Sequence, residues 1–484
     1  MTRPAGAPFA YAPSLESADA VPLRERYGVF VGGAWTAAEG GASFATLDPA
    51  TEATLAQVAL GSAADVDRAV RAARRGYDKY WRKLRPAERA KYMYRIARAL
   101  GERAREFAVA ETLDVGKPIR VARDFDVPQA AAHVFYHAGW ADKLAWAVGP
   151  SDRVRPLGVV GAIVSADFPL LTAAWKIAPA LACGNTVVLK PAPDSPLSAL
   201  LLAQLCADVD LPPGVLNVVT GDDATGRALA EHADVAALAF AGSIASGKAL
   251  RHATAGTGKR LGLELGGKSA VIVYDDAPLD QAIEGIVAAA YSSGGHVGSA
   301  GSRVLVQESI LGEIVERLRA RLGTLRHGNP LDRNTDIGAI RSRERLAKIA
   351  AYVRAGVAEG ATLVQAPWTP PERGFWFAAS FFTDVHPTYG IAREASAGPL
   401  LTVMTFRTPD EAIERANNLP DGLAASVWTA SGALALQTAQ RLACGVVWCN
   451  TVNRFDPSSP FGGRRESGFG RDGGLAGLPA YIDT

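Results

Sequence analysis

The chain has 484 residues, of which 48% are hydrophobic and 21% are charged, and its 51 basic and 49 acidic residues leave a net charge of +2. A chain of this length can bury large cores and is expected to form two or three domains. No run of Lys or Arg is dense enough to neutralise a polyanion, so nucleic acid and anionic membranes are not expected partners. No apolar run is long enough to span a bilayer, which indicates an ordinary soluble protein.

The four cysteines are too few and too scattered for the disulfide scaffold of a secreted domain, and their spacing matches no metal site. They are Cys183, Cys206, Cys444 and Cys449. We expect reduced thiols in a cytoplasmic protein without a bound metal. Residues 1–26 mix Ala, Pro and charges without the apolar segment of a secretory signal, and they predict a loose N-terminal extension.

The first structural signals follow this extension. Residues 27–31 and the turn Gly32-Gly33 predict a hairpin. Apolar residues at helical spacing then predict one helix over 63–80 and another over 86–112, with Pro86 in the first turn, where proline is tolerated.

From Leu157 onward, apolar strands alternate with amphipathic helices. This alternation predicts an α/β fold with a doubly wound parallel sheet and right-handed crossovers, an arrangement typical of dinucleotide-binding domains. Strands are expected at 159–164, 186–189, 215–220 and 235–240, and helices at 170–182 and 198–207.

A second α/β unit is predicted after Lys268. Its expected strands are 269–274, 303–307, 426–429 and 445–450, and its expected helices are 280–291, 309–322, 343–355 and 410–417.

Three motifs carry a family resemblance. They are L-E-L-G-G-K-S at 263–269, G-G-H-V-G-S-A-G-S-R at 294–303, and P-F-G-G-R-R-E-S-G-F-G-R at 460–471. Together they resemble the signatures of the NAD(P)-dependent aldehyde dehydrogenase superfamily, and the resemblance extends over about residues 27–480. The tail motif is specific for the family, although its glycines are explained by tight turns.

The resemblance implies the aldehyde dehydrogenase fold, with a Rossmann-like cofactor domain, an α/β catalytic domain and a reduced oligomerisation hairpin. The hairpin between Trp140 and Pro156 is short, and the chain ends where relatives continue into a further strand. We therefore expect a dimer rather than a larger assembly. The implied division is 1–26 (extension), 27–135 and 156–262 (dinucleotide binding), 263–467 (catalytic type), and 136–155 with 468–484 (shortened oligomerisation elements).

In this family a thiolate attacks the aldehyde, hydride passes to the nicotinamide, and a glutamate-activated water hydrolyses the thioester. The resemblance places the general base at Glu264 and the nucleophilic cysteine at Gly298, which has no side chain. It places the amide that stabilises the oxyanion at Asp167, whose ionised carboxylate would repel that charge. Loss of such a donor costs about 3 kcal/mol of transition-state stabilisation.

Neighbouring side chains do not replace the thiol. Ser299 would need an adjacent base and points elsewhere along the chain, so we interpret it as a small structural residue. His296 stands where relatives have a glutamine, and it is also interpreted as structural. Lys176 and Lys268 match their family motifs.

The cofactor half keeps some family features and loses others. Lys190 matches the lysine that binds the adenine-ribose hydroxyls, and Gly242, Ser243 and Gly247 match a G-S-x-x-x-G turn whose helix start meets the pyrophosphate. The departures are Pro193 for a ribose-binding glutamate, Asp223 for a glycine near the adenine, Ala395 for the nicotinamide-ribose glutamate, and Ala397 for the phenylalanine packed on the nicotinamide. We expect weakened or abolished binding of NAD or NADP.

Four aromatic residues match positions around the family's aldehyde tunnel. They are Phe168, Trp175, Phe455 and Phe461. They could line an apolar pocket, and core packing explains them equally well.

Together these features predict a family member with a degenerate active site. The expected role is a non-catalytic partner or regulatory subunit, as a homodimer or in a hetero-oligomer with an intact aldehyde dehydrogenase. One alternative is an NAD(P)-dependent aldehyde oxidoreductase that works by an atypical mechanism. Another is a binding module that keeps the aromatic pocket for a small ligand.

Overall fold

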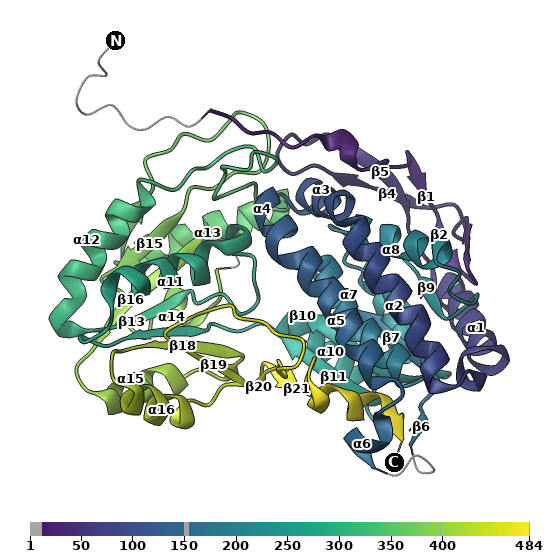
Figure 1. Cartoon of the computed structure of the whole chain (residues 1–484). Coiled ribbons are helices and arrows are strands. Elements are labelled where there is room, and N and C mark those ends of the chain that lie inside the picture. Colours follow the sequence, from purple (N-terminus) through teal and green to yellow (C-terminus); the bar gives the residue numbers. More distant parts are fainter. Residues whose placement is uncertain (1–11, 150–153, 397, 484) are drawn as a thin grey trace.

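The computed structural model describes residues 12–149, 154–396 and 398–483. Two open sheets stand side by side, and helices cover them on their outer faces (Figure 1). The first sheet has eight strands in the order β21-β11-β10-β7-β8-β9-β2-β3, and the second has seven in the order β14-β15-β16-β13-β12-β18-β19. The predicted α/β architecture is confirmed.

In the first sheet, neighbours from β11 to β9 run parallel, and the antiparallel hairpin of β2 and β3 extends one edge. Strands β7 and β8 are buried along their whole length, which fits their Val- and Ile-rich sequences. The strands are β2 (Val29–Val31), β3 (Ala34–Thr36), β7 (Val159–Ile163), β8 (Thr186–Lys190), β9 (Leu216–Val218), β10 (Val235–Gly242), β11 (Arg260–Leu265) and β21 (Gly468–Phe469).

Helix α7 is buried along its entire length. It packs on α5 and α2 (Figure 1), and such all-round burial fits a helix with almost no polar residues. The helices of this unit are α1 (Ala63–Lys79), α2 (Pro86–Glu102), α3 (Ala104–Val115), α4 (Ile119–Val121), α5 (Val127–Trp140), α7 (Pro169–Ala182), α8 (Leu197–Asp208), α9 (Asp223–Glu231) and α10 (Ile244–Ala253).

The second sheet is parallel except for its edge strand β14. Its strands are β12 (Ala270–Val273), β13 (Arg303–Gln307), β14 (Thr362–Gln365), β15 (Ser380–Thr383), β16 (Leu400–Phe406), β18 (Ala424–Trp428) and β19 (Val446–Cys449). Its helices are α11 (Leu279–Tyr291), α12 (Leu311–Leu322), α13 (Arg343–Glu359), α14 (Gly390–Arg393), α15 (Pro409–Asn417) and α16 (Gly432–Arg441).

One expectation about these elements was wrong. The single helix predicted over 86–112 is two helices, because Arg103 leaves the helical conformation with φ −101° and ψ 19°. No strand was predicted directly before Lys268, and the structure has strand β11 there, which runs parallel to β10 and carries Glu264. Residues 263–265 therefore belong to the first sheet. The division into domains otherwise stays a prediction.

Three small sheets complete the fold. Strand β1 (Arg26–Tyr27) pairs with β5 (Thr54–Ala59), which also pairs with β4 (Ser43–Leu47). Strands β17 (Asp421–Gly422) and β20 (Arg464–Arg465) form a second pair. The third joins β6 (Arg155–Pro156) to β22 (Ile482–Asp483).

The region predicted as a shortened oligomerisation hairpin is partly helical. Residues Leu144–Val148 form α6, and the described strand of this region, β6, pairs with β22 at the end of the chain. Residues 150–153 and 484 of the predicted elements lie outside the described residues. On α6, Trp146 is 89% exposed.

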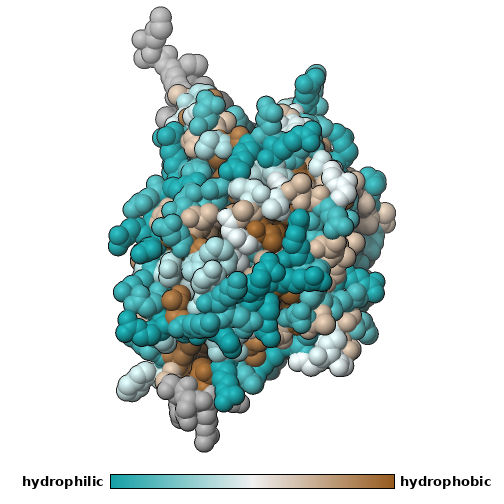
Figure 2. Space-filling model, turned by 90° about the vertical axis from the view of Figure 1, so that its right-hand side faces the viewer, coloured by the Kyte–Doolittle hydropathy of each residue, from teal (hydrophilic) through white to brown (hydrophobic). Residues whose placement is uncertain are grey.

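The face of the molecule at the right-hand side of Figure 1 is mostly hydrophilic, and its apolar side chains lie in separate small patches (Figure 2). Among the described helices, none is both long and apolar enough to cross a bilayer.

Residues 12–26 of the predicted extension are not loose, because they run along both units (Figure 1). The backbone N–H of Arg333 donates to the carbonyl of Ser14, and that of Glu16 donates to the carbonyl of Leu331. The carboxylate of Glu16 accepts from Arg105 of α3 at 2.7 Å and from Arg333 at 2.9 Å. These hydrogen bonds to Arg105 and Arg333 lower the pKa of Glu16 to about 2.

We expect Glu16→Gln to lower the free energy of unfolding at pH 7, because two arginines lose their shared carboxylate. An acid with a depressed pKa stabilises the fold above the pKa of the unfolded chain, about 4.3. That contribution disappears as the pH falls through about 2. Urea unfolding of both proteins between pH 7 and pH 3 should therefore show a gap that narrows towards acid. Glu102→Gln, at an exposed residue, is the control, and an equal gap at every pH would contradict the prediction.

Candidate functional site

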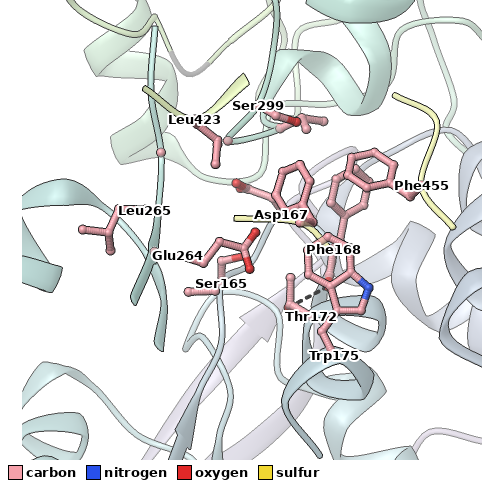
Figure 3. A pocket seen from close by; sticks show the side chains of 16 residues that line it. Ser165, Asp167, Phe168, Thr172, Trp175, Glu264, Leu265, Ser299, Leu423 and Phe455 are labelled. Carbon is pink, nitrogen blue, oxygen red and sulfur yellow. Dashed lines mark hydrogen bonds between the residues drawn. The ribbon is translucent and has the colours of Figure 1, made fainter. Parts of the chain in front are cut away.

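A cavity of about 60 Å³ lies where the two units meet, next to segments that follow β7, β10 and β11. The carboxyl ends of parallel strands are the usual place for a site in such sheets. Its lining residues are Ser165, Asp167, Phe168, Thr172, Trp175, Ala241, Gly242, Glu264, Leu265, Gly266, Val297, Gly298, Ser299, Leu423, Phe455 and Phe461. The structure thus brings together the predicted reaction-centre and pocket residues (Figure 3).

Gly298 leaves an open position in the wall of this cavity. A Cβ added there would lie 3.8 Å from the Cα of Gly266 and 3.9 Å from Oδ2 of Asp167, both ordinary contacts. Its backbone is outside the left-handed region that favours glycine. A residue with a side chain would therefore fit without strain. Among the described residues that line the cavity, none is a cysteine.

Asp167 lies in the loop between β7 and α7 and is held by an arginine of the second unit. Nη1 of Arg341 donates to Oδ1 of Asp167 at 2.9 Å, and its Nε donates to Asp194 at 2.6 Å. Arg341 is 7% exposed. Burial alone would lower the pKa of Arg341, but Asp194 and Asp167 outweigh it and raise the pKa. The guanidinium of Arg341 therefore stays charged and is held against the carboxyl groups of Asp167 and Asp194.

Glu264 is held on the opposite wall by a buried ion pair. Lys176 of α7 donates to Asp472 through a short contact and lies 3.4 Å from Oε2 of Glu264. Burial and the hydrogen bond shared with Asp472 raise the pKa of Glu264 well above its ordinary value. Burial would also raise the pKa of Asp472, but the Lys176 ammonium outweighs it and the pKa is lowered. Glu264 and Asp472 thus share the ammonium group of Lys176, and the raised pKa of Glu264 favours its protonated form more than in an exposed carboxyl group.

All four predicted pocket aromatics line the cavity, and three of them are in ring contact with one another. Ring centroids are 5.3 Å apart for Trp175 and Phe461, 5.1 Å for Phe455 and Phe461, and 5.8 Å for Trp175 and Phe455. The indole Nε1 of Trp175 donates to Nε2 of His133 at 2.8 Å, which fixes the ring. Figure 3 shows the rings of Phe168, Trp175 and Phe455 beside the carboxyl groups of Asp167 and Glu264. Both readings of these residues hold, because the rings pack with one another and also line a space.

On the cofactor side, Lys190 lies at the end of β8 and is 4% exposed. In the described part of the chain its ammonium has no hydrogen-bond or ion-pair partner, so it fits a ligand that offers acceptors, such as the ribose of a dinucleotide. Burial lowers its pKa, and the nearby carboxylates of Asp223, Asp222 and Asp194 oppose that shift. These three carboxylates make the surroundings unfavourable for an additional phosphate.

The predicted G-S-x-x-x-G turn begins α10. The hydroxyl of Ser243 accepts from the backbone N–H of Ser246 at 3.0 Å and caps the helix. A Cβ on Gly247 would lie 2.5 Å from Cδ2 of Leu265, so this glycine lets α10 pack against β11. The helix start is compatible with a diphosphate, and this role for Gly242 and Ser243 stays a prediction.

Four other positions were predicted to differ from the family's cofactor-binding residues. Pro193, Asp223 and Ala395 are exposed, and Ala397 lies outside the described residues. Ser299 is 5% exposed and lies at the edge of the cavity (Figure 3). His296 is buried, and within the described part of the chain neither ring nitrogen has a partner.

Lys268 lies outside the cavity and donates to the hydroxyl of Tyr352 at 2.9 Å. Burial lowers the pKa of Lys268 to about 7. The described residues hold no group of three or more His, Cys, Asp or Glu side chains that could bind a metal.

Two site residues were missed from the sequence. Asp472 directly follows the tail motif, so its position beside a family signature could have drawn attention to it. Arg341 lies in no motif, and nothing in the sequence relates it to Asp167, which is 174 residues away.

Comparisons with known proteins agree with the fold and the motifs. The model of the aldehyde dehydrogenase family matches residues 35–484. The mitochondrial aldehyde dehydrogenase of Homo sapiens is 39% identical over 467 residues, which cover 94% of this chain and 90% of that protein.

Two solved structures match nearly the whole chain. The NAD+ complex of aldehyde dehydrogenase from Bacillus cereus superposes with a TM-score of 0.93 at 36% identity, covering 97% of this chain and 98% of that one. A cysteine-to-alanine mutant of the P. syringae indole-3-acetaldehyde dehydrogenase AldA, in complex with NAD+ and IAA, superposes with a TM-score of 0.92 at 40% identity and covers 96% of each chain.

We expect Asp223→Asn to strengthen the binding of NADP more than that of NAD, because the 2′-phosphate carries the charge that Asp223 repels. The gain should be about two- to fivefold, the size of one exposed charge interaction. Calorimetric titration with each cofactor measures it. Glu231→Gln removes a charge from the far end of the same helix α9 and is the matched control. Equal effects of the two variants would contradict the prediction.

Proposed function

Because the chain belongs to the aldehyde dehydrogenase family, we propose that it is a member that does not carry out thiol-dependent aldehyde oxidation and acts as a non-catalytic subunit. One observation carries this proposal. The position beside Asp167 where the reacting thiol would lie is Gly298, and the described lining of the cavity contains no cysteine.

The thiols elsewhere in the chain support the same conclusion. Burial raises the pKa of Cys183 and of Cys206 to about 12, and it raises that of Cys444 to about 11. Burial also raises the pKa of Cys449, which is exposed on β19. Because the thiolate is the nucleophile, these thiols are poorly suited to attack a carbonyl.

The two remaining polar groups of the reaction centre support it as well. The carboxyl group of Asp167 stands where an amide donor would stabilise the oxyanion, and an ionised carboxylate would repel that charge. Glu264 accepts from Lys176 at 3.4 Å, so an ion pair within the fold explains why this residue is kept. Loss of the nucleophile therefore coincides with a change in the oxyanion site.

Retained cofactor binding is compatible with this role. The relative from P. syringae, a cysteine-to-alanine mutant, forms a complex with NAD+. We infer that this chain binds NAD weakly through Lys190 and the start of α10, because Asp222 and Asp223 lie beside Lys190. We infer no reaction step through the cofactor.

We further propose that the subunit forms a homodimer, or a hetero-oligomer with an intact relative, in the cytoplasm. Trp146 on α6 is 89% exposed, and a large aromatic side chain rarely remains in water without a partner. Its exposure supports a contact between α6 and another subunit. Copurification with a tagged, active relative, followed by light scattering, tests this assembly.

The decisive experiment restores the missing groups. The double variant Gly298→Cys with Asp167→Asn should gain NAD-dependent oxidation of an aldehyde that the unmodified chain lacks. Gly298→Cys alone should be slower by on the order of 10²-fold, because Asp167 raises the pKa of the new thiol and repels the oxyanion. The rate of NADH formation measures the activity of both variants.

Ser299→Cys combined with Asp167→Asn is the matched control, since it adds the same thiol one residue away. It should remain inactive. If the unmodified chain oxidises aldehydes and Glu264→Gln removes that activity, the chain is instead an oxidoreductase with an atypical mechanism, and the proposal is wrong.

A further inference from the structure

Beside Gly298, the cavity is lined by a hydrogen-bond acceptor, the carboxylate of Asp167. Oδ1 of Asp167 is occupied by Arg341 at 2.9 Å, whereas Oδ2 lies 3.9 Å from the position of a Cβ on Gly298. Within the described residues, Oδ2 receives no hydrogen bond. The second carboxylate oxygen therefore faces the space that a side chain at position 298 would fill.

The charges around this space have a definite arrangement. Asp167 and Glu264 are the only ionisable side chains among the described residues that line the cavity. Arg341 lies outside the lining, behind Asp167, and Arg345 is close enough to be affected by both Arg341 and Asp167. The arginines therefore act on Asp167 from outside the lining. The described lining residues include no Lys or Arg, and Lys176 lies behind Glu264, 3.4 Å from its Oε2.

The aromatic side chains that line the cavity suit a cation as well. Trp175, Phe455 and Phe461 lie within 5.8 Å of one another, centroid to centroid. Aromatic faces attract ammonium groups, and this attraction strengthens where water is excluded. An apolar chain attached to the ammonium would pack against the same rings.

We propose that this cavity binds a small primary alkylammonium, with its head group beside Asp167 in the space left by Gly298 and its carbon chain along Trp175, Phe455 and Phe461. The volume of about 60 Å³ is roughly that of two water molecules in the liquid. It accommodates the ammonium and the first carbon atoms of a short chain. The inference rests on the proposed function, because a thiol at position 298 would occupy the same space.

Ligands of the same length but different head groups separate this chemistry from nonspecific apolar binding. An ammonium donates three hydrogen bonds, an alcohol donates one, and an aldehyde or a carboxylate donates none. A charged donor to a carboxylate is about twice as strong as a neutral one. The ligand order should therefore be amine, then alcohol, then aldehyde, with the carboxylate not binding.

The test is calorimetric titration of the full chain with n-propylamine, n-propanol, propionaldehyde and propionate. We expect saturable binding of propylamine, at least about tenfold tighter than that of propanol. Asp167→Asn, which keeps the shape of the side chain, should weaken the amine by about tenfold and leave the alcohol unchanged.

Asp456→Asn is the matched control, because it removes a carboxylate next to Phe455 that is outside the cavity lining and accepts from Ser458. It should leave propylamine affinity within about twofold, since the ligand does not touch it. Gly298→Ala keeps Asp167 but fills part of the space, and it should also weaken the amine. If Asp456→Asn weakens the amine as much as Asp167→Asn does, or if propylamine does not bind to the unmodified chain, this inference is wrong.

The two proposals fail separately. If propylamine does not bind but only the Gly298→Cys, Asp167→Asn variant oxidises aldehydes, the non-catalytic role stands and the amine site is rejected. If the unmodified chain oxidises propionaldehyde, the non-catalytic role is rejected and the amine inference, which depends on it, is rejected too.

Discussion

The reaction centre depends on one buried arginine. Arg341 precedes α13 in the second unit, yet it pairs with Asp167 and Asp194, which lie in loops of the first. Arg341 is 7% exposed, so removing either carboxylate would leave its charge less well compensated and would destabilise the fold. The pairing therefore fixes the two loops against the second unit and fixes position 167 as a carboxylate. The polarity of the cavity follows from that constraint.

A second buried pair sets the opposite wall and joins the end of the chain to the centre. Lys176 and Trp175 are adjacent on α7, so one buried helix supplies both a charge and a ring to the site. Lys176 reaches Asp472, 296 residues further along the chain. Glu264 shares this pair, and burial raises its pKa. Its role in the fold is thus sufficient to explain its position, without any reaction.

The alternation of apolar strands and helices predicted most of the fold, because short Val- and Ile-rich runs leave few other structures. Strand β11 was missed although Leu261, Leu263 and Leu265 alternate as in a half-buried strand, because its end was interpreted as part of a catalytic motif. The break at Arg103 was missed because helical spacing continues across it. Family motifs located Glu264, Gly298 and the pocket aromatics. Ion pairs across hundreds of residues have no local signal, so neither the Arg341 nor the Asp472 partnership was predictable.

The motifs that identify the family also contain residues that the fold requires. A chain can therefore keep these motifs without keeping the family's activity. A Cβ on Gly463 would lie 2.3 Å from the carbonyl of Ser467, and a Cβ on Gly247 would lie 2.5 Å from Cδ2 of Leu265. The close backbone approach at Gly463 needs glycine whether or not the protein catalyses anything. At Gly247 a larger residue would displace the side chain of Leu265. Gly298 differs from these glycines, because a Cβ at this position would make only ordinary contacts and the backbone conformation is open to other residues. Packing does not explain that glycine, so its effect must be sought in what the cavity binds.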